Sequence, residues 1–247
     1  MGGGSVAVQT CVSEDRSLIQ LAERALADAE EALRRDPSAD NERKVWRAWQ
    51  FVRRAREEEP PVQPERSHEL PRSAGTLDDM TPETCTFDDD GRIPNSPLPV
   101  ILYRGVSEAK DAASCEELFA THRWLGAWRD GIFSFHHFHS TAHEVLGIVR
   151  GQVTVMLGGP NGRSFELGPG DVAVLPAGTG HCNAGSSADL LVVGAYPNAM
   201  RWDIRRGEPG EREEVLANIR AVPLPESDPV NGEDGSLVKL WRGAAAE

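Results

Sequence analysis

The chain has 247 residues, which is more than one average domain and less than two. Hydrophobic residues make up 39% of it and 24 residues are glycine, a composition typical of globular proteins that excludes a wholly disordered chain. The formal net charge of −13 disfavours a broad phosphate-binding surface, so we expect no nucleic-acid partner.

The sequence favours a cytoplasmic protein with no membrane partner. No apolar run approaches the roughly 18 residues that a membrane-spanning helix requires, and the first residues lack the basic and apolar blocks of a signal peptide. The cysteines are scattered and form no CxxC pair, so neither a disulfide framework nor a zinc knuckle is predicted. They are Cys11, Cys85, Cys115 and Cys182.

The first 59 residues predict an α-helical hairpin. Apolar residues recur at steps of three and four over residues 18–33, Asp36-Pro37-Ser38 ends this helix, and a second helix follows over about 41–58. We expect Trp46 and Trp49 to be packing anchors. So small a helical pair is not stable alone. Residues 60–86 are rich in Pro, Ser and acidic residues and are predicted to be a linker.

Residues 87–247 have the pattern of a β-protein. Apolar and alternating runs predict strands at about 98–103, 131–139, 143–149, 153–157, 172–175 and 190–195. Helices are expected over about 107–122 and 211–219, followed by an irregular tail that carries Leu240 and Trp241. Short strands separated by glycine-rich turns, such as residues 158–162, predict an antiparallel sandwich or barrel.

Five of the seven histidines lie between positions 136 and 181. Because side chains alternate along a strand, His137 and His139 are expected on one face and His136 on the other. A bend at residues 140–142 would then bring Glu144 from the next strand to the same side as the two imidazoles. His143 would point outward or lie behind the site.

His181 is expected on a loop after the strand that ends at Pro176, as a third imidazole. A mixed nitrogen and oxygen site of this kind suits Fe, Mn, Ni, Cu or Zn and is too nitrogen-rich for Mg or Ca. The sequence therefore predicts one divalent transition metal, held by His137, His139, Glu144 and His181. Four protein ligands would leave two positions open on an octahedral ion.

Two motifs of the chain resemble those of the cupin superfamily. The first, with the pattern G(X)5HXH(X)3–4E(X)6G, is matched by Gly131, His137, His139, Glu144 and Gly151. The second, with the pattern G(X)5PXG(X)2H(X)3N, is matched by Gly170, Pro176, Gly178 and His181. The final asparagine position of the second motif holds Gly185, and Asn183 lies two residues earlier.

Longer stretches, including Trp128-Arg129-Asp130-Gly131 and Val193-Gly194-Ala195-Tyr196-Pro197, are similar to the uncharacterised YjlB-type bacterial cupins. This resemblance covers about residues 87–241. It implies an all-β fold, a double-stranded β-helix or jelly-roll barrel, which in this superfamily usually forms a homodimer. The N-terminal helical hairpin would be an extension of that barrel.

The family resemblance leaves the reaction open, because cupins include dioxygenases, decarboxylases, isomerases and non-catalytic binders. We expect a small-molecule metalloenzyme, an oxidoreductase or lyase acting on a small organic acid or polyol. One alternative is a non-catalytic module that binds a small molecule. Another is a metal-free isomerase-like barrel that uses His137 as a base.

Several other residues have simpler structural interpretations. Phe133, Phe135, Leu146 and Ile148 are expected to line an apolar interior. Cys182 is predicted to be an inert buried thiol, Tyr196 a structural hydroxyl anchor, and Arg129 and Arg150 members of surface ion pairs.

Overall fold

The computed structural model describes residues 81–245 together with shorter stretches nearer the N-terminus: 18, 20–29, 31–32, 35, 44–45, 47–48 and 51. The chain divides into two compact units, Met1–Ser73 and Ala74–Glu247. The described residues of the first unit are helical, and Ala22 is buried against Leu18 and Leu26. The predicted turn at 36–38 and the anchors Trp46 and Trp49 lie outside the described residues, so the hairpin stays a prediction.

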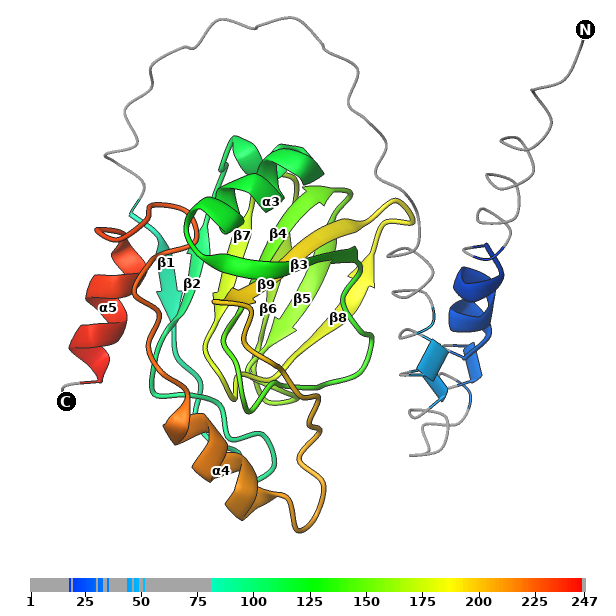
Figure 1. Cartoon of the computed structure of the whole chain (residues 1–247). Helices are drawn as coiled ribbons and strands as arrows, with labels where there is room; N and C mark the ends of the chain where they lie inside the picture. Colours follow the sequence, from blue (N-terminus) through cyan, green and yellow to red (C-terminus); the bar gives the residue numbers. More distant parts are fainter. Residues whose placement is uncertain are drawn as a thin grey trace, which may run out of the picture. The chain divides into compact units, whose positions relative to one another are not determined.

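The second unit contains two antiparallel sheets (Figure 1). The larger sheet has the strand order β1-β2-β7-β4-β9-β3, formed by Glu83–Cys85, Val100–Tyr103, Val172–Leu175, Glu144–Arg150, Leu191–Pro197 and Trp124–Asp130. The smaller has the order β6-β5-β8, formed by Arg163–Leu167, Val153–Leu157 and His181–Ser186. This confirms the β-rich class, although the hydrogen-bonded ladders of the described strands do not close a barrel.

The central strands of the larger sheet are buried on both faces. Leu146 and Ile148 of β4 pack with Val153 and Val155 of β5 in a core that both sheets share. The alternate residues of β4, such as Val145, belong to a second core with the helices α3 (Ala112–Thr121) and α5 (Ser236–Ala244). Strand β4 is therefore apolar on both sides, and Glu144 at its first position is an exception that needs a specific partner.

Close packing of α3 on the sheet depends on a glycine in β4. A Cβ atom at Gly147 would lie 2.6 Å from the sulfur of Cys115 and 3.2 Å from the ring of Phe119, both on α3. The helix begins where the side chain of Asp111 accepts a hydrogen bond from the backbone N–H of Ser114 at 2.9 Å. A glycine and an N-cap thus place α3 over the centre of the larger sheet.

The C-terminal segment is a helix, where the sequence predicted an irregular tail. Leu237, Val238 and Trp241 of α5 are buried, and the indole N–H of Trp241 donates to the carbonyl of Pro99 at 2.8 Å. These residues lie at helical spacing, but the segment is too short for its periodicity to stand out from the polar residues beside it. The helix α4, Arg212–Ala221, agrees with the predicted helix.

The predicted strand at 131–139 is wrong. Only His137 and Phe138 form bridges there, each with a single partner residue, and the strand β3 lies just before this segment. Alternating aromatic and histidine residues imitate the period of a strand although the backbone is largely irregular. Strand β1 also falls within the predicted linker, and His181 opens β8 rather than lying on a loop.

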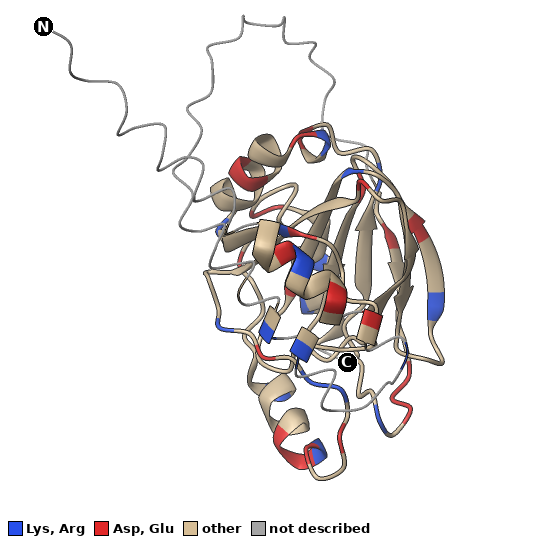
Figure 2. Cartoon of the chain, turned by 90° about the vertical axis from the view of Figure 1, so that its right-hand side faces the viewer, with Lys and Arg blue, Asp and Glu red and all other residues tan. Residues whose placement is uncertain are grey.

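Charged residues of both signs are interspersed over the described part of the second unit (Figure 2). Arg129 forms the expected surface ion pair, with Glu116 at 2.7 Å. Arg150 instead donates to the backbone carbonyl of Asp189 at 3.0 Å, so the carboxylate expected as its partner is replaced by a peptide oxygen. Within the described residues, no helix is both long enough and apolar enough to span a bilayer.

Candidate metal centre

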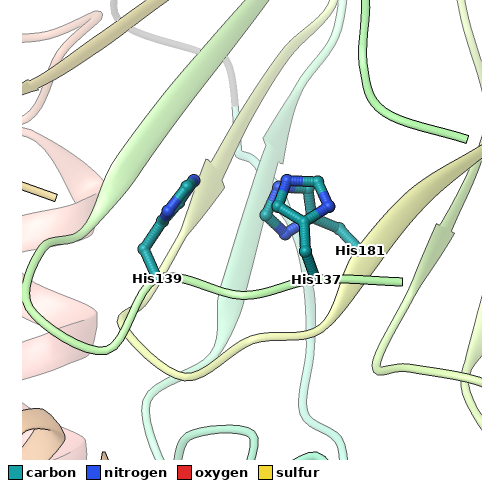
Figure 3. A group of neighbouring side chains, drawn as sticks. All are labelled: His137, His139 and His181. Atoms are coloured by element: carbon teal, nitrogen blue, oxygen red, sulfur yellow. The ribbon is translucent and has the colours of Figure 1, made fainter. Parts of the chain in front are cut away.

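Three of the predicted ligands come together at one buried point. Each of His137, His139 and His181 offers a ring nitrogen, and these nitrogens lie within 4.8 Å of one another. All three side chains are buried. Figure 3 shows His137 and His139 on one segment of chain and His181 on the adjacent strand. The three imidazoles are therefore grouped in space, and their role as metal ligands stays a prediction.

The backbone holds two of these histidines side by side. The N–H of His137 donates to the carbonyl of His181 at 3.1 Å, and the N–H of His181 donates back at 2.8 Å. Their ring centroids are 4.0 Å apart. This isolated bridge replaces the long strand that the sequence predicted, and it is sufficient to align the two rings.

All three imidazoles have the same tautomer. The Nδ1 atoms of His137 and His181 lie 3.1 Å from the carbonyl oxygens of Phe135 and Thr179, and Nδ1 of His139 contacts the carbonyl of Asp203. A carbonyl oxygen can only accept, so each Nδ1 must carry the proton. In its neutral form each ring therefore carries its lone pair on Nε2, as a metal-binding histidine requires.

Glu144 places an oxygen beside two of the three imidazoles. Its Oε2 lies 3.3 Å from Nε2 of His139 and 3.4 Å from Nε2 of His181. Among the described residues this buried oxygen has no hydrogen-bond partner, whereas Oε1 accepts from the hydroxyl of Tyr196 at 2.9 Å. An orphaned carboxylate oxygen that faces nitrogen lone pairs needs a positive charge between them, and a divalent cation fits this requirement.

The electrostatics of the cluster favour a neutral His137 and an ionised Glu144, the forms that bind a metal, whereas they favour a protonated His139. Burial and the neighbouring His181 lower the pKa of His137 well below its usual value. Burial acts to raise the pKa of Glu144, but His139 and His181 outweigh it and hold the pKa below its usual range. Burial also opposes the charged form of His139, yet the Glu144 carboxylate raises its pKa. The buried carboxylate thus attracts a positive charge, which a proton or a metal ion can supply.

A polar clamp that the sequence analysis missed fixes His139. Besides its carbonyl contact with His139, Asp203 accepts hydrogen bonds on its carboxylate from the N–H and the hydroxyl of Ser140, both at 2.6 Å. Arg205 donates to the same carboxylate at 2.7 Å. Burial acts to raise the pKa of Asp203, but these partners lower it. Asp203 lies 64 positions after His139, so local sequence patterns could not have indicated the contact.

Asn95 and a motif glycine place His181. Gly178 has a φ of +92°, and a Cβ there would lie 2.6 Å from the carbonyl oxygen of Asn95. The buried amide of Asn95 accepts from the N–H of Gly180 and donates to the carbonyl of Gly158, both at 3.1 Å. The backbone conformation at position 178 therefore explains why the second motif has a glycine there. Asn95 supports this turn, and the sequence analysis did not identify it.

The other histidines of the cluster do not face the site. His143 lies on the opposite side of β4 from Glu144, as parity predicted, but it is buried instead of outward. Its Nδ1 accepts from the N–H of Ala177 at 2.9 Å, its ring packs 4.6 Å from Trp241, and burial lowers its pKa to about 4. His136 is half-buried rather than outward, with Nε2 3.6 Å from the sulfur of Cys182.

Two residues near His181 do not contribute to the site. Cys182 is buried, and burial raises its pKa to about 11, as expected of an inert thiol. Asn183 does not replace the missing asparagine of the second motif, because its amide bonds locally to Ser186 and to the N–H of Gly185. No Cβ clash explains Gly185, whose surroundings within 4 Å are open.

Two aromatic rings and a cation lie beside His137. Phe133 and Phe135 stack at 4.8 Å and meet the His137 ring edge-on at 5.1 and 5.6 Å. They are only partly buried and so form a wall beside the cluster, whereas Leu146 and Ile148 line the apolar core as predicted. The guanidinium of Arg206 lies 4.6 Å from the Phe135 ring centroid.

The register indicates the direction of Arg206. Phe138 pairs with Arg205, so these two side chains share one face, and Arg206 shares the opposite face with His137. A cation and an aromatic surface therefore lie on the side of the segment that carries the imidazoles.

Residues 129–200 match the protein-family model described as Cupin. The chain is 39% identical over 160 residues to the uncharacterized protein YjlB of Bacillus subtilis (strain 168), a match that covers 64% of this chain and 96% of that protein. The extent of the second match means that nearly the whole of YjlB has a counterpart here.

Two solved structures are similar at low identity. An acireductone dioxygenase from Bacillus anthracis with a cadmium ion in its active centre is 19% identical with a TM-score of 0.27, over 36% of this chain and 60% of that one. A single-residue variant of oxalate decarboxylase from Bacillus subtilis is 16% identical with a TM-score of 0.28, over 47% of this chain and 29% of that one. At these values neither structure bears on the activity of this chain.

Proposed function

This chain belongs to the cupin family, and on that basis we propose that it binds one divalent transition metal through His137, His139, Glu144 and His181 and acts as a small-molecule metalloenzyme. The observation that carries the proposal is the convergence of three buried imidazole nitrogens, with an oxygen of Glu144 that lacks a hydrogen-bond partner among the described residues lying 3.3 and 3.4 Å from two of the rings. Fe, Mn, Ni, Cu and Zn all suit such a donor set.

A bound metal would supply Lewis acidity toward an oxygen atom of the substrate. The residues of the chain would bind and orient that substrate. Phe133 and Phe135 offer an apolar surface beside His137, and the guanidinium of Arg206 above Phe135 favours an anionic group over a neutral one. We therefore favour an oxidoreductase or lyase acting on a small organic acid, with a polyol as the less favoured substrate.

Metal content tests the proposal most directly. Protein purified without added metal is analysed for its elements, alongside the variants His137→Ala and Glu144→Ala. We expect close to one Fe, Mn, Ni, Cu or Zn per chain in the wild type and a strong loss in both variants. His122→Ala, the same change outside the cluster, serves as a control that keeps its metal. Wild-type content in both site variants would refute the proposed ligands.

Turnover separates an enzyme from a non-catalytic binding module. Oxygen consumption or loss of carbon dioxide from a small organic acid, dependent on added Fe(II) or Mn(II), supports the enzyme. A tightly bound small molecule that is released unchanged supports the binding module. A protein that is active and free of metal would instead favour the isomerase-like barrel with His137 as its base.

The domain division and the assembly are part of the same proposal. We propose that residues 87–247, together with the paired strand β1 (Glu83–Cys85), form the cupin domain, that the rest of residues 60–86 links it to a helical extension over residues 1–59, and that the protein is a homodimer. Light scattering coupled to size-exclusion chromatography measures the assembly directly, and a monomer at micromolar concentration would contradict the dimer.

A further inference from the structure

The hydroxyl of Tyr196 is the one group that the described residues place against the second oxygen of Glu144. Both side chains are 3% exposed, and the hydroxyl oxygen lies 2.9 Å from Oε1. The two residues come from neighbouring strands, since β9 pairs with β4 next to this point, with Ala195 opposite Val145. Tyr196 therefore contacts the proposed ligand from within the sheet that carries it.

The direction of this hydrogen bond is fixed by Trp128. The indole N–H of Trp128 lies 2.9 Å from the Tyr196 oxygen. An indole can only donate, so the tyrosine oxygen accepts from Trp128 and its own proton is left for Glu144. The two hydrogen bonds therefore run in one direction, from Trp128 to Tyr196 and from Tyr196 to Oε1 of Glu144.

Packing leaves the Tyr196 ring little freedom to move. It stacks on Trp202 at 5.6 Å with an interplanar angle of 22°, and it meets the ring of His139 edge-on at 6.1 Å. Trp128 in turn lies flat against Gly194, where a Cβ atom would come within 2.1 Å of the indole. The hydroxyl is therefore held in place before any ligand binds.

We propose that Tyr196 is a positioning residue that makes Glu144 a monodentate ligand. Its hydroxyl donates to Oε1, which disfavours that oxygen as a second metal ligand and leaves Oε2 for the ion. Oε2 is also the oxygen that lies within 3.4 Å of two Nε2 atoms and lacks a hydrogen-bond partner among the described residues. This inference rests on the proposed metal site and adds to it a residue outside the cupin motifs.

The experiment compares three variants of the full-length chain with Mn(II) as the probe. Tyr196→Phe removes the hydroxyl, Trp128→Phe keeps it but removes its donor, and Tyr103→Phe makes the same change at the other tyrosine of the chain. Affinity is measured by calorimetric titration of the metal-free protein, and the metal's coordination shell by X-ray absorption spectroscopy. Thermal unfolding of each metal-free variant establishes that it is folded.

We expect Tyr196→Phe to bind Mn(II) about 10- to 100-fold more weakly, the usual cost of losing a group that orients a metal ligand. We also expect its carboxylate contribution to shift from one oxygen toward two. Trp128→Phe should weaken binding about threefold to tenfold, below the range for losing the orienting group itself. Tyr103→Phe should bind like the wild type.

Three results overturn the inference in distinguishable ways. If the wild type binds Mn(II) but both Tyr196→Phe and Trp128→Phe keep the wild-type affinity and coordination shell, Tyr196 does not position the ligand. If the wild type does not bind Mn(II) and its elemental analysis finds no other transition metal, the proposed metal function fails, and the role of Tyr196 fails with it. A loss of affinity with an unchanged coordination shell would refute the monodentate assignment.

Discussion

Each of the two tyrosines of this chain donates its hydroxyl to a buried carboxylate, but the two carboxylates differ in what else they bind. Asp228 accepts from Tyr103 and also from three backbone N–H groups, those of Val230, Asn231 and Leu237. Within the part of the chain that the structure describes, Glu144 accepts from Tyr196 alone, and its second oxygen faces two imidazoles.

The difference separates a structural carboxylate from a candidate ligand. Burial and the carboxylate of Asp228 raise the pKa of Tyr103, so the phenol stays protonated and donates permanently. With both oxygens satisfied, Asp228 ties the N-terminal turn of α5 to β2 and has no capacity for a ligand. Glu144 has one oxygen that lacks a hydrogen-bond partner among the described residues and faces the Nε2 atoms of His139 and His181. The unsatisfied group marks the site, since burial without a partner is costly.

The largest expected effect comes from breaking the structural pair. Asp228→Ala removes the acceptor of four hydrogen bonds and leaves buried donors unpaired, so we expect a loss of about 3 kcal/mol in the free energy of unfolding. Urea denaturation of the metal-free protein measures it. Chains that remain folded should keep the metal affinity of the wild type, and an unchanged unfolding midpoint would show that Asp228 does not hold α5.

The corresponding change at Glu144 should affect metal affinity strongly and stability little. Glu144→Gln keeps the shape of the side chain and an oxygen for Tyr196 but removes the charge. We therefore expect Mn(II) affinity to fall by about 100-fold or more. The unfolding free energy of the metal-free protein should change by less than about 1 kcal/mol. Calorimetric titration and urea denaturation measure the two quantities. Glu116→Gln is the surface control, and equal affinity in both variants would contradict a ligand role for Glu144.

Removing the hydroxyl of Tyr103 tests whether the carboxylates of Asp228 and Glu144 have different roles. Tyr103→Phe should lower the unfolding free energy by about 1–2 kcal/mol, because Asp228 loses one of its donors and keeps the others. Its Mn(II) affinity should stay within about twofold of the wild type, in contrast to the 10- to 100-fold loss expected for Tyr196→Phe. If both variants lost metal affinity to the same extent, the two carboxylates would not have distinct roles.

A weaker effect is expected from the clamp behind His139. Asp203→Asn keeps one acceptor for Ser140 but loses the charge that pairs with Arg205, at 2.7 Å in the wild type. We expect Mn(II) affinity to fall by about threefold to tenfold, at or below the low end of the loss seen when a residue that hydrogen-bonds to a metal ligand is changed. Titration of the variant beside Asp89→Asn, which breaks an ion pair to Arg212 instead, measures this. Equal losses in the two variants would mean that the clamp does not act through His139.

The smallest effect concerns the N-terminal unit. Deleting residues 1–64 should leave both carboxylate pairs intact, with a melting temperature within about 3 °C of the full chain and the same metal content, if the extension is a separate folding unit. Differential scanning calorimetry and elemental analysis test this. A deletion that unfolds the remaining chain would contradict the proposed boundary.

Much of the candidate metal centre could be predicted because the proposed ligands lie in short motifs. His137, His139 and Glu144 fall within eight residues, and Gly178 before His181 adopts the left-handed conformation that glycine tolerates best. Parity on an extended segment correctly separated His143 from Glu144. The same reasoning mistook residues 131–136 for a strand, since alternation of side chains does not require a ladder of hydrogen bonds.

The groups that orient those ligands were not predictable in the same way. Asp203, Tyr196 and Asn95 contact residues between 52 and 85 positions away. None of them stands out by composition or spacing, and only the tertiary packing of distant segments brings them to the site. Tyr196 was expected to be a structural anchor, and the structure gives that anchor a specific carboxylate.

By itself, the sequence determined the β-rich class, the cupin family and the residues that converge as imidazole donors, because these depend on local periodicity, on turn glycines and on short spacings. Only the tertiary structure decided which oxygen of Glu144 is free, which nitrogen of each imidazole carries the proton, and which buried histidine lies outside the cluster. Those properties depend on hydrogen-bond partners supplied by distant segments, and a partner's position is set by packing rather than by its place in the chain.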